Sequence, residues 1–309
     1  MAYGIVQADV IQSSETGISL GAGNATNFKN RFINPQFQIA QRGTSGTSGS
    51  GVPTTTATYP SVDRWFAYGT GATVTVAQVA GSGNVKNYLQ LTGAASVTGA
   101  GIGQRIEAVN SYDLAGRTAT LSAYISNSLL TTVTWTAYYA GSTDVWTSST
   151  QIATGTFTVT SSLTQYSAQI SIPSAATTGI QIIFSVGAQT SGTFVLSNPQ
   201  LEVGSSATGF DFRDYGTELI LCQRYFQTIP TGTLKIEGYG GVGYNACFTA
   251  LFPVTMRTSP TAVVAWATAT NITNGPFIAS TVSGFNGDGN TASGAFTGIL
   301  GVATLSAEL

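Results

Sequence analysis

The residues of this chain that could carry catalysis are its carboxylates. Three of its thirteen Asp and Glu residues are clustered at Asp211, Asp214 and Glu218, and Asp63 stands beside Arg64. Two carboxylates facing each other across a cleft are sufficient for glycoside hydrolysis. Acids at the start of a helix also complement its N-terminal dipole, and we favour that interpretation for the cluster. We expect Asp63 to form a local ion pair, and we predict no catalytic residue and no enzyme.

Other catalytic and metal-binding chemistries lack the residues that they need. The chain has no histidine, which removes Ser-His-Asp and Cys-His catalysis together with histidine metal sites. Its two cysteines, Cys222 and Cys247, cannot form a structural zinc site. The glycine-rich run 99–103 lacks the lysine and the helix of a phosphate-binding loop, and is typical of a turn. The alternating oxygens around Asp288 lack the glycine and the glutamate of a calcium loop, so we predict no metal and no cofactor.

Four aromatic residues within twelve positions form the first candidate binding feature: Trp135, Tyr138, Tyr139 and Trp146. Flat rings beside hydroxyls and amides are a common way to hold a neutral sugar. On a strand, Trp135 and Tyr139 would share one face and Tyr138 the other, and core packing is favoured for the first two. We therefore predict Tyr138, and Trp146 in a loop at 141–149, as glycan contacts.

The C-terminal region offers a second candidate surface. Residues 238–245 place Tyr239 and Tyr244 among glycines, and residues 284–290 are also rich in turn-forming residues. Loops on a rigid scaffold often carry recognition. We predict Tyr239 and Tyr244 as further glycan contacts, with an ordinary hairpin tip as the alternative for each loop.

The low charge of the chain argues against several kinds of partner. Charged residues make up 8% of the sequence, the net charge is −2, and no basic patch is visible. We therefore expect no nucleic-acid partner. No run approaches the roughly 20 apolar residues of a membrane span, and the N-terminus lacks the pattern of a secretory signal. We expect synthesis in a cytoplasm and no insertion into a membrane.

Short alternating strands separated by turns predict an all-β fold. About ten such segments lie between residues 31 and 212, and this spacing is typical of a β-sandwich or jelly roll. Asp144 is the single charged residue between Thr118 and Leu201. Uncharged strand edges are normally aggregation hazards, so we expect these edges to be covered or buried by oligomerisation.

The segments on either side of the sandwich have different patterns. Apolar residues at Leu219, Cys222 and Phe226 predict a helix over 215–226, and strands return after it. We interpret 213–309 as this helix followed by a small C-terminal β domain. Residues 1–30 form an arm that cannot bury a core alone.

Several motifs occur in an order that resembles tailed-phage tail-fibre proteins, of the kind found in cyanophages and other aquatic phages. The motifs are NRFINPQFQIAQRG at 30–43, Tyr59, DRW at 63–65, GQRIE at 103–107, NPQLEVGSSAT at 198–208, FDFR at 210–213 and ELILCQRYF at 218–226. The N-terminal YG, ADVI and GAGNA segments between residues 3 and 25 are also similar. The resemblance covers roughly residues 1–257.

The resemblance implies a carbohydrate-binding-module-like jelly roll in a homotrimeric virion protein. It implies that the arm docks to a tail or baseplate protein and that a distal part contacts a host-surface receptor, which we expect to be a glycan. In the arm we predict docking through the apolar residues Tyr3, Ile5, Val6, Val10 and Ile11. The resemblance supplies no catalytic residue. Two alternatives stay open: a head-decoration or capsid-fibre protein, and a glycan depolymerase spike.

Overall fold

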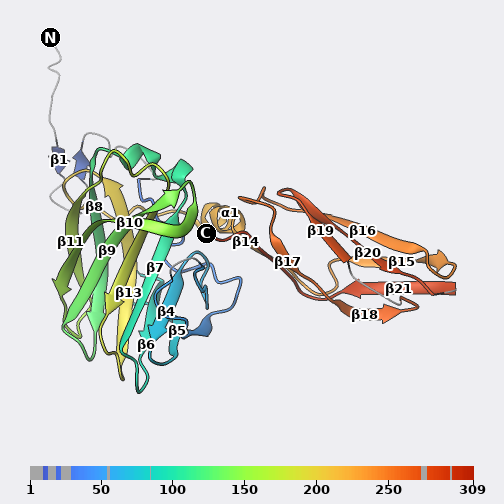
Figure 1. Ribbon diagram of the computed structural model, residues 1–309. Helices are drawn as coiled ribbons and strands as arrows, with labels where there is room; N and C mark the ends of the chain where they lie inside the picture. The colour runs from blue at the N-terminus through green and yellow to red at the C-terminus, as the bar shows by residue number, and fades with distance from the viewer. Residues whose placement is uncertain are drawn as a thin grey trace, which may run out of the picture. The chain divides into compact units, whose positions relative to one another are not determined.

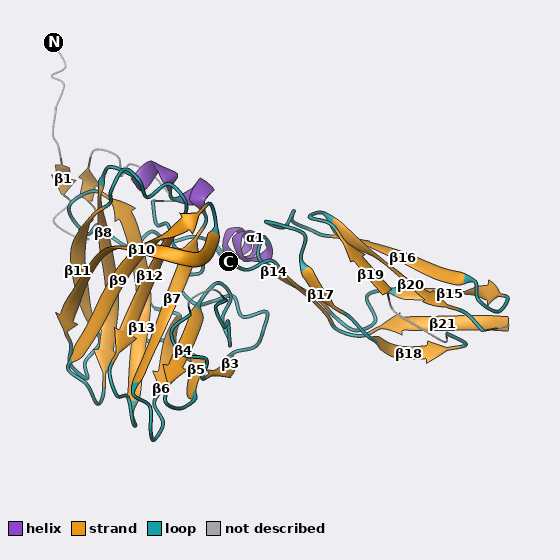
Figure 2. Ribbon diagram, viewed as in Figure 1, coloured by secondary structure: helices purple, strands orange, loops and turns teal. Residues whose placement is uncertain are grey.

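A computed structural model describes residues 10–12, 19–21, 29–53, 56–83, 85–272, 277–292 and 294–309 of the chain. The chain forms two compact units, Met1–Tyr215 with Leu309, and Gly216–Glu308. Figure 1 shows the elements in chain order, and Figure 2 shows that strands make up most of both units. The all-β prediction is confirmed.

The first unit is a sandwich of two antiparallel sheets. One sheet has five strands, in the order β10 (Val145–Thr158), β9 (Thr132–Ser142), β12 (Ile180–Val186), β7 (Gly99–Ile106) and β4 (Phe66–Thr70). The other has six, in the order β11 (Thr164–Ser171), β8 (Thr118–Asn127), β13 (Thr193–Val203), β6 (Asn87–Thr92), β5 (Val74–Ala80) and β3 (Ser45–Ser48). Two short 3-10 helices, η1 (Ala108–Asn110) and η2 (Tyr112–Leu114), follow β7, and β1 (Val10–Gln12) pairs with β2 (Ser19–Gly21) in the arm.

The core of the first unit lies between these two sheets. Alternate residues of each strand point inward, as in β9, where Val133, Trp135 and Ala137 are buried between more exposed threonines. Their inward face meets residues such as Leu121 and Ile125 of β8, which belong to the same buried cluster. Each large apolar side chain that is fully buried contributes about 1.5–3 kcal/mol to folding. The outward faces are therefore free to carry the polar residues of a binding surface.

The one predicted helix is present but ends earlier than expected. Helix α1 spans Tyr215–Gln223, and the backbone N–H of Tyr225 donates to the carbonyl of Cys222 at 2.9 Å, which closes the last turn. Phe226 already begins strand β14 (Phe226–Ile229). Of the apolar residues that predicted the helix, Cys222 and Phe226 are buried, whereas Leu219 is only partly buried and the neighbouring acid Glu218 is buried instead. No helix in the described part of the chain is long and apolar enough to cross a membrane.

The second unit consists of three small antiparallel sheets with three strands each. The first contains β14, β22 (Ala303–Ser306) and β17 (Thr261–Val263), the second β15 (Lys235–Gly240), β21 (Gly294–Leu300) and β18 (Trp266–Thr270), and the third β16 (Asn245–Leu251), β20 (Gly284–Asn290) and β19 (Phe277–Ser280). Its main buried cluster is small and consists of Ala250, Met256, Phe285, Leu300, Ala303, Leu305 and Ala307.

Three glycine-rich segments that the sequence assigned to turns or loops are largely strands. Residues 99–103 belong to β7, residues 284–290 form β20, and much of 238–245 lies in β15 and β16. The physical reason is visible at Gly287, where a Cβ atom would lie 2.1 Å from the ring of Phe248. An aromatic ring on the neighbouring strand fills the space above the glycine, so the strand forms despite its low intrinsic preference.

Candidate functional site

The best-defined sequence motifs are parts of the buried framework of the first unit. Trp65 is 1% exposed, and its ring centroid lies 5.2 Å from those of both Phe32 and Phe37. Its indole N–H donates to the carbonyl of Asn34 at 2.9 Å. Asp63 is fully buried and pairs with Arg42 at 3.5 Å, a partner that the sequence did not indicate. The NRFINPQFQIAQRG and DRW motifs therefore pack against each other as part of the buried framework.

The GQRIE motif also has a structural role. Gln104 is fully buried, and its amide accepts from the N–H of Ile33 and donates to the carbonyl of Ile33, both at 2.8 Å. The side chain therefore takes the place of a missing strand partner and satisfies two backbone groups that would otherwise be buried without hydrogen bonds. Sequence motifs of this kind specify the fold.

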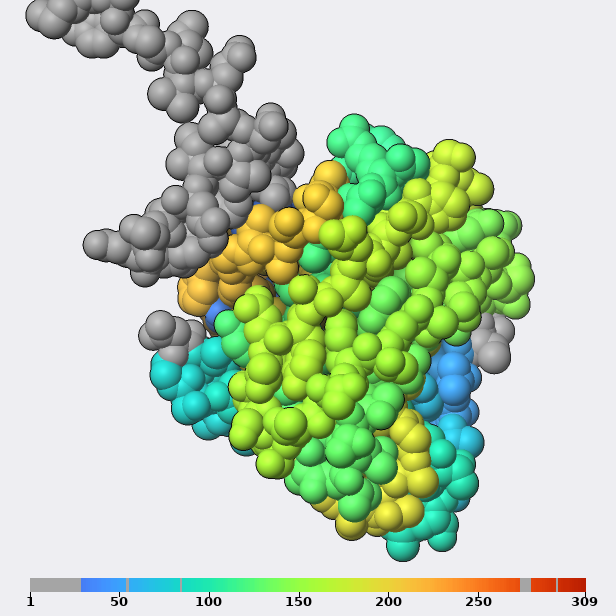
Figure 3. All heavy atoms as spheres, turned by 90° about the vertical axis from the view of Figure 1, so that its left-hand side faces the viewer, coloured from blue at the N-terminus to red at the C-terminus, as the bar shows by residue number. Residues whose placement is uncertain are grey.

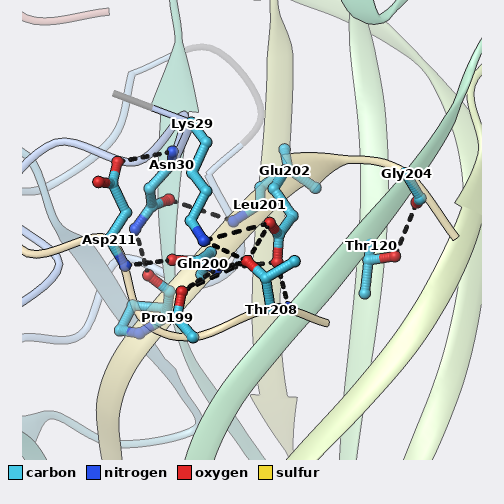
Figure 4. A network of polar contacts seen from close by, with 11 residues as sticks. Lys29, Asn30, Thr120, Pro199, Gln200, Leu201, Glu202, Gly204, Thr208 and Asp211 are labelled. Carbon is cyan, nitrogen blue, oxygen red and sulfur yellow. Dashed lines mark hydrogen bonds and ion pairs between the residues drawn. The ribbon is translucent and has the colours of Figure 1, made fainter. Parts of the chain in front are cut away.

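The closing motif at 198–208 forms a buried polar network, which Figure 4 shows from close by. Glu202 is fully buried and accepts hydrogen bonds from the N–H of Thr208 at 2.8 Å, its hydroxyl at 2.6 Å and the amide of Gln200 at 2.8 Å. Lys29 lies 3.9 Å from the same carboxylate and also donates to the Thr208 hydroxyl. Because its polar atoms are used internally, this network ties the segment at Lys29, which precedes the first strand of the sandwich, to its last strand, β13.

The acids that could have been catalytic are mostly enclosed in the same way. Asp211 is 5% exposed and accepts from the backbone N–H of Asn30 at 3.1 Å, while its own N–H donates to Gln200 at 2.8 Å. Glu218 is 1% exposed on the helix, and Asp214 is exposed just before it. No group of three potential metal ligands lies together among the described residues. This arrangement supports a structural role for the cluster.

The outer face of the five-stranded sheet has a different character, because aromatic rings cover part of it. Phe66 and Tyr68 of β4 lie across Gly103 and Gly101 of β7, where an added Cβ would approach the two rings to 2.4 and 2.6 Å. These rings form a small cluster with Ile183, against which Tyr59 and Tyr138 pack. Both β4 rings are buried, so this half of the face is closed.

Arg105 of β7 lies under the closed half and organises the polar groups beside it. Its guanidinium carbon is 5.0 Å from the ring centre of Trp146 and 5.9 Å from that of Phe66. Its Nε donates to Oε1 of Gln181 at 2.8 Å, and Nη1 donates to the carbonyl of Leu309 at 2.9 Å. Burial lowers the pKa of Arg105 from its ordinary value. The contact with Arg105 holds the amide of Gln181, a residue that also lines the open half of the face.

The open half contains a pocket of about 290 Å³ beside Tyr138. Its lining consists of Val52, Pro53, Tyr138, Thr147, Ser148, Ser149, Gln181 and Ile183. The lining therefore combines one half-buried aromatic ring, one oriented amide, three hydroxyls and three apolar side chains, and it contains no charged residue. A ligand here would meet an apolar surface edged by neutral donors and acceptors.

A ladder of threonines continues the same face away from the pocket. Thr154 is opposite Thr136, and Thr156 is opposite Thr134, across strands β10 and β9. The Thr136 and Thr154 hydroxyl oxygens are 3.1 Å apart. Figure 3 shows one side of the molecule on which the segment from β9 to β11, green to yellow-green, predominates. Asp144 is the single charge of that segment, so this part of the surface is built from neutral polar groups.

The predicted glycan contacts fall in different environments. Tyr138 lines the pocket, as just described. Trp146 lies on strand β10 rather than in a loop, and at 3% exposure it is a buried partner of Arg105, which corrects the expectation that it would be accessible. Tyr239 and Tyr244 are 85% and 68% exposed and belong to the second unit.

Sequence reasoning missed several pocket residues and could not place the arm. The signal for Gln181 was one polar residue between Ile180 and Ile182, in a strand that otherwise reads as buried. In the arm, Tyr3, Ile5 and Val6 lie outside the described residues, and Val10 and Ile11 belong to strand β1.

Comparisons with known proteins find similar solved structures but no similar sequence family. No protein-family model matches the sequence, and no curated protein matches it. Among solved structures, the chain is similar to a CBM4 module, with 13% identity, 55% of this chain and 98% of that chain covered, and a TM-score of 0.37.

Two further structures are similar to this chain. The CBM22-2 xylan-binding domain of Paenibacillus barcinonensis Xyn10C has 16% identity, 46% of this chain and 92% of that chain covered, and a TM-score of 0.33. The enzymatically active domain of tailspike protein 4 from bacteriophage CBA120 has 14% identity, 57% of this chain but 22% of that chain covered, and a TM-score of 0.37. At these identities and TM-scores the likenesses carry no argument about a ligand.

Proposed function

We propose that this chain is a non-enzymatic tail fibre of a bacteriophage, assembled in the host cytoplasm, which binds a neutral host-surface glycan through the first unit. The site is the open half of the outer face of the five-stranded sheet, around Tyr138. Support for the fibre role comes from the ordered motifs between residues 1 and 257. Support for the glycan comes from the pocket chemistry.

The observation that carries the proposal is the neutral composition of this pocket. The ring of Tyr138 provides an apolar surface for the C–H face of a sugar, and Gln181 and Ser149 provide hydrogen bonds for its hydroxyls. A charged ligand would find no opposite charge in the lining, since all eight residues are neutral. The pocket volume of about 290 Å³ suits one sugar unit of a longer chain, which the threonine ladder would continue to contact.

The direct test is to replace Tyr138 by alanine and measure binding to a glycan array and to host cells. We expect affinity to fall by about tenfold, which corresponds to about 1.4 kcal/mol, because the apolar surface and the stacking of the ring are both lost. Tyr112→Ala is the matched control, because Tyr112 is an exposed tyrosine of the same unit outside the pocket. Unchanged binding by Tyr138→Ala would contradict the site.

The proposed fibre is a homotrimer that docks through residues 1–30 to a tail or baseplate protein. Support for self-association comes from the second unit, where Val242, Val263 and Val302 are 79%, 66% and 56% exposed. Exposed apolar side chains beside so small a buried cluster favour assembly. Labelling of intact particles at the arm tests the placement, and label on heads instead of tails would favour the head-decoration alternative.

A further inference from the structure

The sheet formed by β16, β20 and β19 carries on its exposed side a pocket that the proposed glycan site does not use. The pocket has a volume of about 530 Å³ and is lined by Cys247, Phe248, Thr249, Ala279, Asn286, Gly287 and Asp288. The register places Cys247 opposite Asp288, and Thr249 opposite Asn286. Directly paired residues point to the same face, so these four side chains line one surface.

Asp288 is the unusual member of this surface. It is the single charged residue between Arg257 and Glu308. Its carboxylate has one described contact, with the Asn245 amide at 3.5 Å, so the fold makes little use of it. Asp, Asn and Gly are unfavourable in strands, yet β20 has the sequence GFNGDGN. A strand that departs from local preference on its exposed face is typical of a functional surface.

The inner face of the same strand explains how β20 stays folded. Phe248 packs over Gly287, and its ring centroid lies 5.9 Å from Phe285 and 5.8 Å from Trp266. Because Phe285 and Gly287 face this inner side, Asn286 and Asp288 point to the opposite, more exposed side of the strand. The amide of Asn286 and the carboxylate of Asp288 are therefore available to a ligand on the exposed face of the sheet.

Among the described residues, no three Cys, Asp or Glu side chains lie together in a group that could hold a metal ion. A sugar fits better, because a carboxylate accepts from two neighbouring hydroxyls while amides donate and accept beside it. Ala279 and the methyl group of Thr249 add apolar contact for the ring carbons.

We propose that this pocket is a second carbohydrate site, in which Asp288 and Asn286 bind adjacent hydroxyls of a neutral sugar. It is independent of the site at Tyr138 and makes the chain bivalent. Two weak sites on one chain raise the avidity for a repeating surface polysaccharide well above the affinity of either site.

Cys247 provides a reporter inside the pocket of the unmodified protein. It is exposed, whereas the other cysteine, Cys222, is fully buried, so iodoacetamide should label Cys247 selectively in the native chain. The probes are cello-, xylo-, manno- and galacto-oligosaccharides. A saccharide that occupies the pocket at about ten times its Kd should slow alkylation of Cys247 about tenfold by mass action.

Variants complete the test on an array of the same oligosaccharides. In the full-length Tyr138→Ala background we expect residual binding, and Asp288→Asn should weaken it about tenfold because a charge-assisted hydrogen bond is lost. Glu237→Gln is the matched control, since it removes an exposed carboxylate of the same unit that pairs with Lys235.

The outcomes separate the two sites. Unchanged alkylation of Cys247 with every saccharide that the chain binds, or unchanged residual binding after Asp288→Asn, would overturn the second site. Loss of all binding in Tyr138→Ala alone would overturn it too and leave the first site standing. Loss of all binding in Asp288→Asn alone would support the second site and overturn the first, and a chain that binds no saccharide would overturn both.

Discussion

At the scale of single residues, the outer face of the five-stranded sheet includes the buried phenol of Tyr68, whose neutral form the fold favours. Tyr68 is 5% exposed beneath this face, and its hydroxyl hydrogen-bonds to Ser185. Burial raises the pKa of Tyr68 to about 12, because the phenolate would be poorly solvated there; the hydrogen bond opposes the shift and nearby Tyr138 adds to it. The neutral phenol belongs to the cluster against which Tyr138 packs.

The raised pKa of Tyr68 predicts a loss of stability at high pH. The unfolded tyrosine loses its proton near pH 10, so its stabilising contribution is complete below that pH and declines as the pH rises toward 12. Urea unfolding of wild type and of Tyr68→Phe measures this effect. Between pH 9 and pH 11, the free energy of unfolding of wild type should fall by about 1–2 kcal/mol relative to that of Tyr68→Phe. A pH-independent difference would contradict a buried neutral phenol.

At the scale of elements, strand β7 shows how glycines create the closed half of the outer face. An added Cβ at Gly103 would lie 2.4 Å from the Phe66 ring and 2.6 Å from the carbonyl oxygen of Ile182. An added Cβ at Gly99 of the same strand would have its nearest neighbour at 3.8 Å, an ordinary contact. The two glycines therefore have unequal importance although both lie in one glycine-rich run.

This difference predicts the effect of alanine at the two positions. Gly103→Ala should destabilise the protein by about 1–3 kcal/mol, because a backbone carbonyl cannot move aside and the ring must shift. Gly99→Ala should change stability by less than about 0.5 kcal/mol. Thermal or chemical unfolding monitored by circular dichroism measures both. Equal effects of the two substitutions would contradict the packing of Phe66 on β7.

At the scale of the whole molecule, the charge-free strands and the exposed apolar side chains of the second unit both favour assembly. We expect the intact chain to sediment at about three times its mass of 31.8 kDa in analytical ultracentrifugation. Val263→Glu should shift the protein toward monomer, because a charge in an apolar interface is costly. Val109→Glu is the control, since Val109 has a similar exposure of 62% in the first unit. A monomer at micromolar concentration would overturn the trimer.

The sequence by itself determined the features that depend on local pattern. Alternation in β9 predicted that Trp135 and Tyr139 would pack in the core, where Trp135 is buried and Tyr139 packs against the buried cluster, and turns between short strands predicted an all-β fold. The missing histidines removed whole classes of catalysis. The position of the helix and its buried Cys222 could also be predicted, whereas the burial of Glu218 could not, because an acid interrupts the apolar pattern.

Only the tertiary structure decided which residues are available to a ligand. Trp146 was expected to be accessible but is buried against Arg105, which comes from strand β7, 41 positions earlier in the sequence. Gln181 joins Tyr138 in the pocket because β12 pairs with β9, and the segment around Ala57 and Tyr59 packs against the rings beside them. Alternation along a strand is a local property, whereas exposure depends on what distant segments cover, and that is settled only when the sheets pack.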